Sequence, residues 1–226
     1  MSIKFQPPDD AAQDATRQHL LEAAGEVFAE VGFHSATVRE ICQRAGANVA
    51  AVNYHFRDKD GLYAAVLTES LRLSLKKYPA DMGLPPKATP EQRLHAFARS
   101  FLWRIFSTGA ESRHGRLMAR EMVEPSAALD PMVKEHIRPL SDLLMSIVSD
   151  LLGDKADPQT IRLCAMSVVS QVVFYHHCRP VLSRLFPSVK FDPVSIDHLA
   201  DHITRFSLAG IKSAAGKRAP ACLPGK

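Results

Sequence analysis

The stretch "GANVAAVNYHFRDKDGLY", residues 46–63, brings together side chains that suit contacts with a nucleic acid. Its first half carries small residues whose methyl groups could meet thymine methyls, namely Val49, Ala50 and Ala51. Its second half carries side chains that could donate hydrogen bonds to phosphates or base edges, namely Asn53, Tyr54 and His55. The small residues would also let a helix backbone approach base edges closely. The composition therefore favours contact with DNA.

A helix of about two turns is not stable in isolation, so neighbouring helices must hold this one. Asn48 is a good N-cap for it, and Val52 with Phe56 forms one apolar face that could anchor it. An amphipathic helix is predicted over residues 15–31, and a shorter helix should end before Gly46. Two short helices joined by a glycine turn, after a longer helix, are typical of a helix-turn-helix unit.

Residues on either side of the short helix could add contacts with a DNA backbone. Thr37 and Glu40 have capping-box spacing, so Thr37 and Arg39 begin the supporting helix, where amides and a guanidinium can hold a phosphate. Lys59 lies near the start of the following helix, which Asp58 can cap. The alternative interpretation is a buried aromatic cluster inside an arbitrary helical bundle.

The charge distribution limits how such a unit could bind. The chain has 226 residues and a formal net charge of +4, but residues 1–60 carry 6 Lys/Arg against 9 Asp/Glu. The N-terminal part therefore has no general basic field, and its few cations must act locally.

Composition excludes several protein classes. The first residues show no signal-peptide pattern, and no stretch is apolar enough for a membrane span, so we expect a cytoplasmic protein without a membrane partner. The 4 cysteines form no CxxC pair, which argues against a disulfide framework or a zinc finger.

Periodicity predicts an all-α fold throughout the chain. A cluster rich in proline and glycine, residues 78–90, separates two domains. Later helices should begin at capping residues followed by proline and run from Thr89 to about Ser107, from Asp130 to Leu152 with a kink at Pro139, from Asp157 to about Pro180, and from Asp192 to about Gly210. The predicted division is a flexible N-terminus (1–14), a helix-turn-helix domain (15–77), a helical ligand-binding and dimerisation domain (78–213) and a flexible tail (214–226).

The second domain contains the apolar stretch "IRLCAMSVVSQVVFYHHCRPVLSRLF", residues 161–186. A monomeric surface helix would not be apolar nearly all round, so burial in a subunit interface is the simplest explanation. A small-molecule pocket could be lined by apolar residues whose spacing also suits an ordinary core, namely Phe97, Phe101, Met118, Met122 and Phe174.

Histidines and a cysteine in the second domain allow a different hypothesis. His198 and His202 are four residues apart, so both could face one metal ion, and His176 and His177 adjoin Cys178. No further ligand completes a coordination set by spacing, and Cys178 has no evident oxyanion donor. The alternative function is thus a helical metal-binding protein or enzyme, whereas we expect no metal, no cofactor and no enzymatic activity.

The segment "TVREICQRAGANVAAVNYHFRDKDGLY" resembles the TetR family of transcriptional regulators, from about Thr16 to Leu75 when the first helix is included. The resemblance implies DNA contacts from residues at matching positions, namely Thr37, Arg39, Val49, Ala50, Ala51, Asn53, Tyr54, His55 and Lys59. Two positions depart from the family pattern: Ala50 stands where glycine is usual, and Asn53 where an aromatic residue is usual.

Two C-terminal stretches, "FYHHCRPVLSRLFP" and "IDHLADHITRFSLAGI", resemble the C-terminal domain of the CecR-like branch of that family. The resemblance implies that the last two long helices form a four-helix dimer interface and that the preceding helices enclose an effector pocket. The expected function is therefore a homodimeric repressor that a small molecule releases from a palindromic double-stranded operator.

Overall fold

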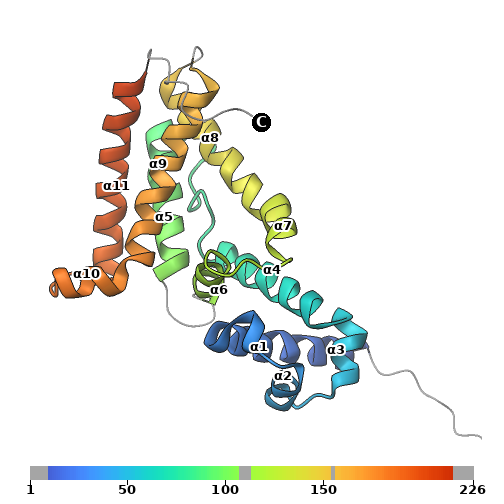
Figure 1. Ribbon diagram of the computed structural model, residues 1–226. Helices are drawn as coiled ribbons and strands as arrows, with labels where there is room; N and C mark the ends of the chain where they lie inside the picture. Colours follow the sequence, from blue (N-terminus) through green and yellow to red (C-terminus); the bar gives the residue numbers. More distant parts are fainter. Residues whose placement is uncertain (1–9, 107–112, 154–155, 216–226) are drawn as a thin grey trace, which may run out of the picture. The chain divides into compact units, whose positions relative to one another are not determined.

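The computed structural model describes residues 10–106, 113–153 and 156–215, and these residues form helices and no strand (Figure 1). The all-α prediction is therefore confirmed. Residues 1–9 and 216–226, most of the two ends predicted to be flexible, lie outside the described residues. By contact, the chain divides into a first unit, Met1–Arg72 with Arg113–Val133, and a second unit, Leu73–Ser112 with Lys134–Lys226.

The first unit contains the helix-turn-helix pattern and a later helix that joins it. Its helices are α1 (Asp10–Ser35), α2 (Val38–Ala45), α3 (Val49–Phe56), α4 (Lys59–Lys77, which crosses into the second unit), α6 (Arg113–Glu121) and the short α7 (Leu129–Met132). α1 begins earlier than the helix predicted from residue 15, and Gly32 interrupts it with φ 83°. The N-terminal helices of this unit thus follow the predicted order.

The predicted capping residues begin the short helices. The hydroxyl of Thr37 accepts from the N–H of Glu40 at 3.2 Å at the start of α2. Oδ1 of Asn48 accepts from the N–H of Ala51 at 2.9 Å, which satisfies one of the free amides of α3. Gly46 ends α2 in the left-handed conformation, φ 63°, which glycine adopts without steric cost. The short helices are therefore defined by local hydrogen bonds at both ends.

The second unit is a set of long helices. They are α5 (Pro90–Phe106), the π-helical turn η2 (Val133–Ile137), α8 (Arg138–Leu152), α9 (Pro158–His177), α10 (Arg179–Leu185) and α11 (Pro193–Ala214). Each of α5, α9 and α11 begins at a predicted capping residue. At α5 the residues form a reciprocal capping box: the N–H of Thr89 donates to the side chain of Gln92 at 2.9 Å, and the N–H of Gln92 donates to the hydroxyl of Thr89 at 3.3 Å. The predicted starts of these three helices are confirmed, whereas Asp130 is not a cap: it lies inside α7, whose N-cap is Ala128.

Three features differ from the predictions. α6 lies where no helix was predicted, and it packs against α1 although it follows α5 in sequence. The helix expected from Asp130 to Leu152 changes to a π-helical turn immediately before Arg138 and Pro139, which lacks the N–H needed to continue regular α-helical bonding. The helix expected to reach Pro180 ends at His177, and α10 follows as a separate helix.

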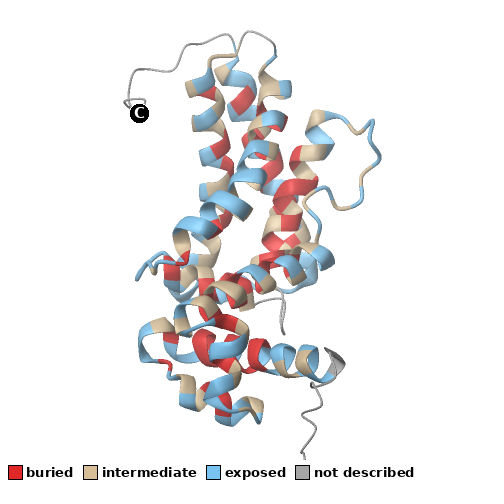
Figure 2. Ribbon diagram, turned by 90° about the vertical axis from the view of Figure 1, so that its right-hand side faces the viewer, coloured by how far each residue is buried: buried red, intermediate tan, exposed pale blue. Residues whose placement is uncertain are grey.

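Two buried clusters connect the helices of the second unit, and Figure 2 shows buried residues on helix faces that turn toward other helices. One joins α5, α8 and α9 through Phe97, Leu144, Ile147 and neighbouring residues. The other joins α5, α9 and α11 through Leu102, Val172 and Ile203, among others. α5 contributes to both clusters and is the central helix of this unit.

Candidate nucleic-acid interface

α3 has a buried face and an exposed face, as the sequence predicts. Val52 and Phe56 are buried among the helices of the first unit. The side facing away from them exposes most of the predicted DNA contacts, namely Val49, Ala50, Asn53 and Tyr54, while Ala51 and His55 are half-buried. Burial of two apolar anchors therefore presents the polar residues on one accessible surface.

Tyr54 is the largest exposed side chain of α3. It is 71% exposed, and its hydroxyl donates to Oε1 of Gln13 on α1 at 3.1 Å. Its ring meets the ring of His55 edge-on, with centroids 4.9 Å apart. These contacts orient the tyrosine while leaving most of its surface accessible to a phosphate or a base.

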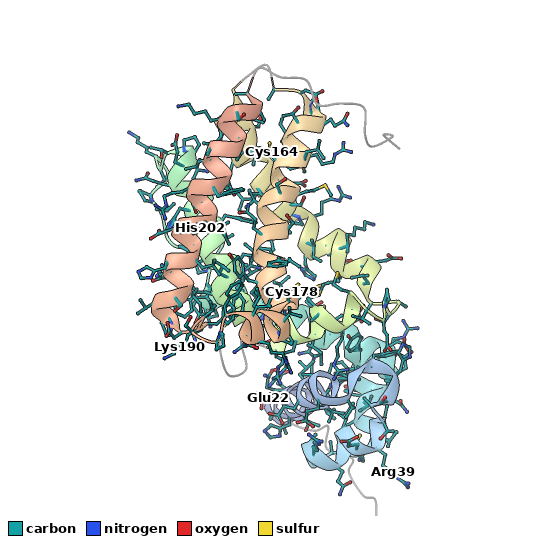
Figure 3. The ribbon with its side chains drawn as sticks, turned by 60° about the vertical axis from the view of Figure 1, so that its left-hand side comes forward. Glu22, Arg39, Cys164, Cys178, Lys190 and His202 are labelled. Atoms are coloured by element: carbon teal, nitrogen blue, oxygen red, sulfur yellow. The ribbon has the colours of Figure 1, made fainter. Side chains whose placement is uncertain are left out.

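The start of α2 supplies two further predicted contacts. Thr37 and Arg39 are exposed, and Figure 3 shows Arg39 extending from the ribbon of α2. The hydroxyl of Thr37 serves as the helix cap, but the first amides of a helix carry partial positive charge that favours an anion. An exposed guanidinium beside such amides can hold a phosphate or reach a guanine.

Lys59 is more constrained than the sequence indicates. Its Nζ donates to the carbonyl oxygen of His34 at 3.3 Å and lies 4.6 Å from the ring centroid of Phe33. The ammonium group is thus engaged at the C-terminal end of α1, where a cation interacts favourably with the helix dipole. Lys59 positions α4 against α1 in this arrangement.

Two arginines beside α3 were absent from the sequence-based contact set. Arg57 is exposed at the end of α3 with φ 75°, and its N–H donates to the carbonyl of Asn53 at 3.1 Å. The guanidinium of Arg17 on α1 lies 5.5 Å from the ring centroid of Phe56. Because this unit has few cations, proximity of Arg57 to α3 in the sequence was a signal that could have identified it.

Two arginines of α6 pack closely against two glycines of α1. A Cβ on Gly25 would lie 2.6 Å from Cδ of Arg113, and a Cβ on Gly32 would lie 3.0 Å from Nη1 of Arg120. Arg120 also donates to the carbonyl oxygen of Glu30 at 2.5 Å. The two glycines are seven residues apart in α1, and the two arginines are seven residues apart in α6. This matching spacing brings one face of α6 against one face of α1.

The predicted effector-pocket residues fall in different places. Phe97 and Phe101 lie together in the second unit, with ring centroids 6.4 Å apart, and Phe97 belongs to its core. Phe174 is largely exposed on α9. Met118 and Met122 belong to the first unit, where Met122 is exposed.

A pocket of about 600 Å³ lies in the second unit between α5, α11 and the segment 78–89, and none of the five predicted residues lines it. The carboxylate of Asp197 accepts from Nε and Nη2 of Arg99 at 2.8 and 3.0 Å, and from Nε1 of Trp103 at 2.9 Å. One turn away, Nε2 of His95 lies 2.9 Å from Oδ1 of Asp201. Four polar residues of this wall are therefore already paired with one another, as Arg99 with Asp197 and His95 with Asp201.

The histidines and cysteines do not form a cluster within the part of the chain that the structure describes, where no group of three or more His, Cys, Asp or Glu could hold a metal ion. His198 and His202 are exposed on α11, and Cys178 joins α9 to α10 (Figure 3). Burial, with the nearby charges of His177 and Arg179, lowers the pKa of His176. Cys222 lies outside the described residues.

The short exposed helix α3, supported by α1 and α2, defines a helix-turn-helix DNA-binding protein with a separate helical C-terminal unit. The family comparison agrees. Residues 20–66 match the model described as "Bacterial regulatory proteins, tetR family", and residues 90–211 match "HTH-type transcriptional dual regulator CecR, C-terminal domain". The chain belongs to the TetR family of DNA-binding transcriptional regulators, with a CecR-like C-terminal domain. Both models describe regulatory proteins.

The curated relatives match over part of their length. The HTH-type transcriptional regulator BetI from several strains of Escherichia coli is 33% identical over 89 residues. This stretch covers 39% of the present chain and 46% of BetI.

Solved structures share this fold over most of the chain. A TetR-family transcriptional regulator from Streptomyces coelicolor has a TM-score of 0.63 and 19% identity, covering 88% of this chain and 97% of that one. The transcriptional regulator FadR from Bacillus subtilis, solved in complex with stearoyl-CoA, has a TM-score of 0.65 and 15% identity, covering 85% and 98%. In the described ranges, no helix is both long and apolar enough to cross a membrane.

Proposed function

We propose that this protein is a homodimeric repressor that binds a palindromic operator and is released by a small-molecule effector. The observation that carries the proposal is the arrangement of α3, which buries Val52 and Phe56 and exposes Asn53 and Tyr54. A helix of this size enters the major groove, where side chains can read base edges. Action on chromosomal DNA would place the protein in the cytoplasm.

The contact residues proposed for DNA are the predicted set other than Lys59, together with Arg57. Val49, Ala50 and Ala51 would allow close approach, and Asn53, Tyr54 and His55 would donate to bases or phosphates. Thr37 and Arg39 would hold the backbone beside α2. Lys59 would act mainly by holding α4 to α1, since its ammonium group already has two contacts there.

Dimerisation through α9 and α11 is supported by the large apolar side chains that both helices expose. Met166 and Phe174 on α9, and Phe206 on α11, are exposed in the single chain. The two helices contact each other, so these exposed residues lie on neighbouring helices. A two-fold dimer would place two α3 helices about 34–36 Å apart, or a multiple of that spacing, on a palindromic site.

Effector release requires that a change in the second unit reaches α3. α6 continues the chain from α5 and is fastened to α1 at Gly25 and Gly32. An effector in the second unit, with Phe97 and Phe101 in its vicinity, could act through this helix. The structure of B. subtilis FadR with stearoyl-CoA shows that a protein of this fold holds a small molecule. Shifting a regulator from 99:1 to 1:99 needs about 5.5 kcal/mol of differential binding.

A gel-shift assay with genomic fragments, followed by footprinting, tests the proposal. Wild-type protein should bind a palindromic site with salt-sensitive affinity, and Tyr54→Ala should weaken binding while leaving the dimer folded. Thr68→Ala, an exposed change in the middle of α4, is the control and should bind as wild type. Binding at non-specific affinity only, for every fragment, would contradict the proposal.

A further inference from the structure

Arg104, near the C-terminal end of α5, is a charged residue buried in the second unit. It is 3% exposed, and its Nε has no hydrogen-bond partner among the described residues. Its guanidinium carbon lies 5.1 Å from the ring centroid of Phe101. A cation that is removed from water without a counter-ion is unfavourable, because the aromatic face replaces only part of its hydration.

Among the described residues, no acidic side chain is paired with the Arg104 guanidinium. Burial alone lowers the pKa of Arg104 to about 10, so the guanidinium remains protonated near neutral pH. Other arginines with low exposure differ in this respect. Arg99 is paired with Asp197 at 2.8 Å. Arg113 also has a buried Nε without a hydrogen-bond partner, but the carboxylate of Glu26 lies 3.9 Å from its Nη2. In the described chain, Arg104 therefore stands out as a buried charge whose partner is missing.

A second unsatisfied donor lies near the end of α4, one turn before a residue that contacts α5. Ser74, in the last turns of α4, is fully buried, and its Oγ has no hydrogen-bond partner in the described part of the structure. Oγ of Ser100 donates to the carbonyl oxygen of Tyr78 at 2.9 Å. Ser74 precedes Tyr78 by one helical turn, and Arg104 follows Ser100 by one turn. Ser74 and Arg104 thus each lie about 6 Å along the chain axis from the contact between Ser100 and Tyr78.

The remaining surroundings are apolar. Phe97, Phe101 and Arg104 follow the i, i+4, i+7 spacing that places side chains on one helix face. Phe97 packs in the cluster that includes Leu144 and Ile147 of α8, and Phe101 packs against that cluster. A molecule that meets this face of α5 would contact aromatic and aliphatic surface, with one cation and one hydroxyl to satisfy.

We propose that Arg104 binds the carboxylate of a small, otherwise apolar molecule, and that the hydroxyl of Ser74 donates a further hydrogen bond to it. A carboxylate carries one negative charge, which balances one guanidinium, and its two oxygens match the planar N–H donors of arginine. A phosphate dianion would leave excess charge buried. That this molecule is the effector rests on the proposed function, but its binding to Arg104 does not.

Binding can be measured on the purified full chain by isothermal titration calorimetry. The probes are octanoate and phenylacetate, compared with their neutral analogues octanamide and phenylacetamide. Wild-type protein should bind at least one carboxylate more tightly than its amide, and Arg104→Met should weaken that binding by roughly tenfold to a hundredfold. Arg162→Met, which removes an exposed arginine of α9, is the matched control and should bind as wild type.

Thermal unfolding without ligand separates a binding role from a structural one. Arg104→Met removes an uncompensated charge and should raise the melting temperature of the ligand-free protein, whereas loss of a structural arginine would lower it. The proposal is overturned if neither carboxylate binds wild type, if inorganic phosphate binds in their place, if Arg104→Met retains the affinity, or if its melting temperature falls. Ser74→Ala should weaken carboxylate binding less than Arg104→Met, and an equal or larger loss would contradict the leading role of Arg104.

A gel shift with the operator then separates this inference from the proposed function. If octanoate binds through Arg104 but leaves the operator complex intact, the carboxylate site stands and release by that ligand fails. If a neutral compound releases DNA from wild type and Arg104→Met alike, release by an effector stands and the carboxylate inference is overturned.

Discussion

The hydroxyl of Tyr63 on α4 donates a 2.8 Å hydrogen bond to Oε1 of Glu121, a residue of α6 that is 1% exposed. Oε2 of the same carboxylate accepts from the N–H and the hydroxyl of Ser126, at 3.1 and 3.2 Å. The ring of Tyr63 also meets Phe28 of α1 edge-on, with centroids 4.8 Å apart. Tyr63 therefore links three helices of the first unit, α1, α4 and α6. The buried carboxylate of Glu121 is satisfied by the hydrogen bonds from Tyr63 and Ser126.

Tyr63→Phe should lower the free energy of unfolding by about 1–3 kcal/mol, because it leaves a buried carboxylate oxygen without one of its donors. Urea denaturation of the full chain measures this difference. Tyr54→Phe removes a hydroxyl from an exposed ring and should change stability by less than about 0.5 kcal/mol. Equal effects of the two substitutions would show that the bond to Glu121 contributes nothing specific.

The same contact predicts a pH dependence. Burial, together with the hydrogen bond to Glu121, raises the pKa of Tyr63 well above its usual range. The unfolded chain releases the phenol proton near pH 10 while the folded chain retains it, so the contribution to stability is complete below about pH 10 and is lost as the pH rises further. Stability measured from pH 9 to pH 11 should fall less steeply in Tyr63→Phe than in wild type. Parallel curves would contradict the assignment.

Gly61, in the first turn of α4, touches the end of α3. A Cβ at this position would lie 2.1 Å from the carbonyl oxygen of Phe56, so a backbone must shift. Gly61→Ala should cost about 1–3 kcal/mol or more in unfolding free energy and should weaken operator binding. Gly210→Ala on α11, where nothing lies within 4 Å, should instead stabilise by roughly 0.5–1 kcal/mol. Thermal unfolding compares the two, and a tolerated Gly61→Ala would show that α3 and α4 are not fixed by this contact.

The hydrogen bonds of Asp197 on α11 should contribute to stability by an amount that depends on pH and on salt concentration. Hydrogen bonds from Arg99, and secondarily from Trp103, lower the pKa of Asp197. The contribution is therefore present above about pH 4 and is lost as the pH falls below that value. Because the pair is partly exposed, Asp197→Asn should cost only about 1 kcal/mol or less, and less in 1 M salt. A loss of stability in Asp197→Asn that salt leaves unchanged would indicate that packing, and not the ion pair, is responsible.

Phe206 on α11 tests the proposed dimer. The side chain is 66% exposed in the single chain, and a glutamate there would place a charge in an apolar interface. Phe206→Glu should give a folded monomer by light scattering and should lose high-affinity operator binding. Val123→Glu, an equally exposed change in the first unit, should remain dimeric. A dimeric Phe206→Glu protein would place the interface elsewhere.

Local signals in the sequence predicted much of the helix-turn-helix unit. Thr37 and Asn48 cap their helices through hydrogen bonds to residues three positions away, and Gly46 ends α2 by its own backbone freedom. Val52 and Phe56 could be assigned to a buried face because helical periodicity relates residues close in sequence. These features depend on a few consecutive residues.

Other features depend on residues that are far apart in the chain. α6 was missed because its helix gains stability by packing two arginines against glycines of α1, and no local pattern relates positions 113 and 25. The contacts of Lys59 with Phe33 and His34 follow from how α4 crosses the end of α1, and no local pattern predicts them. Phe97 and Phe101 could be placed on one face, but not distinguished as core or pocket.

The sequence by itself determined the all-helical class, the positions of the caps and turns, and the family, because these follow from local hydrogen bonding, periodicity and a contiguous motif. Only the tertiary structure decided which charges are compensated. The buried carboxylate of Glu121 accepts a hydrogen bond from Tyr63, and Asp197 is paired with Arg99, whereas none of the described acidic residues pairs with the buried Arg104. Compensation of a buried charge depends on distances between separate helices, which are set when the helices pack together.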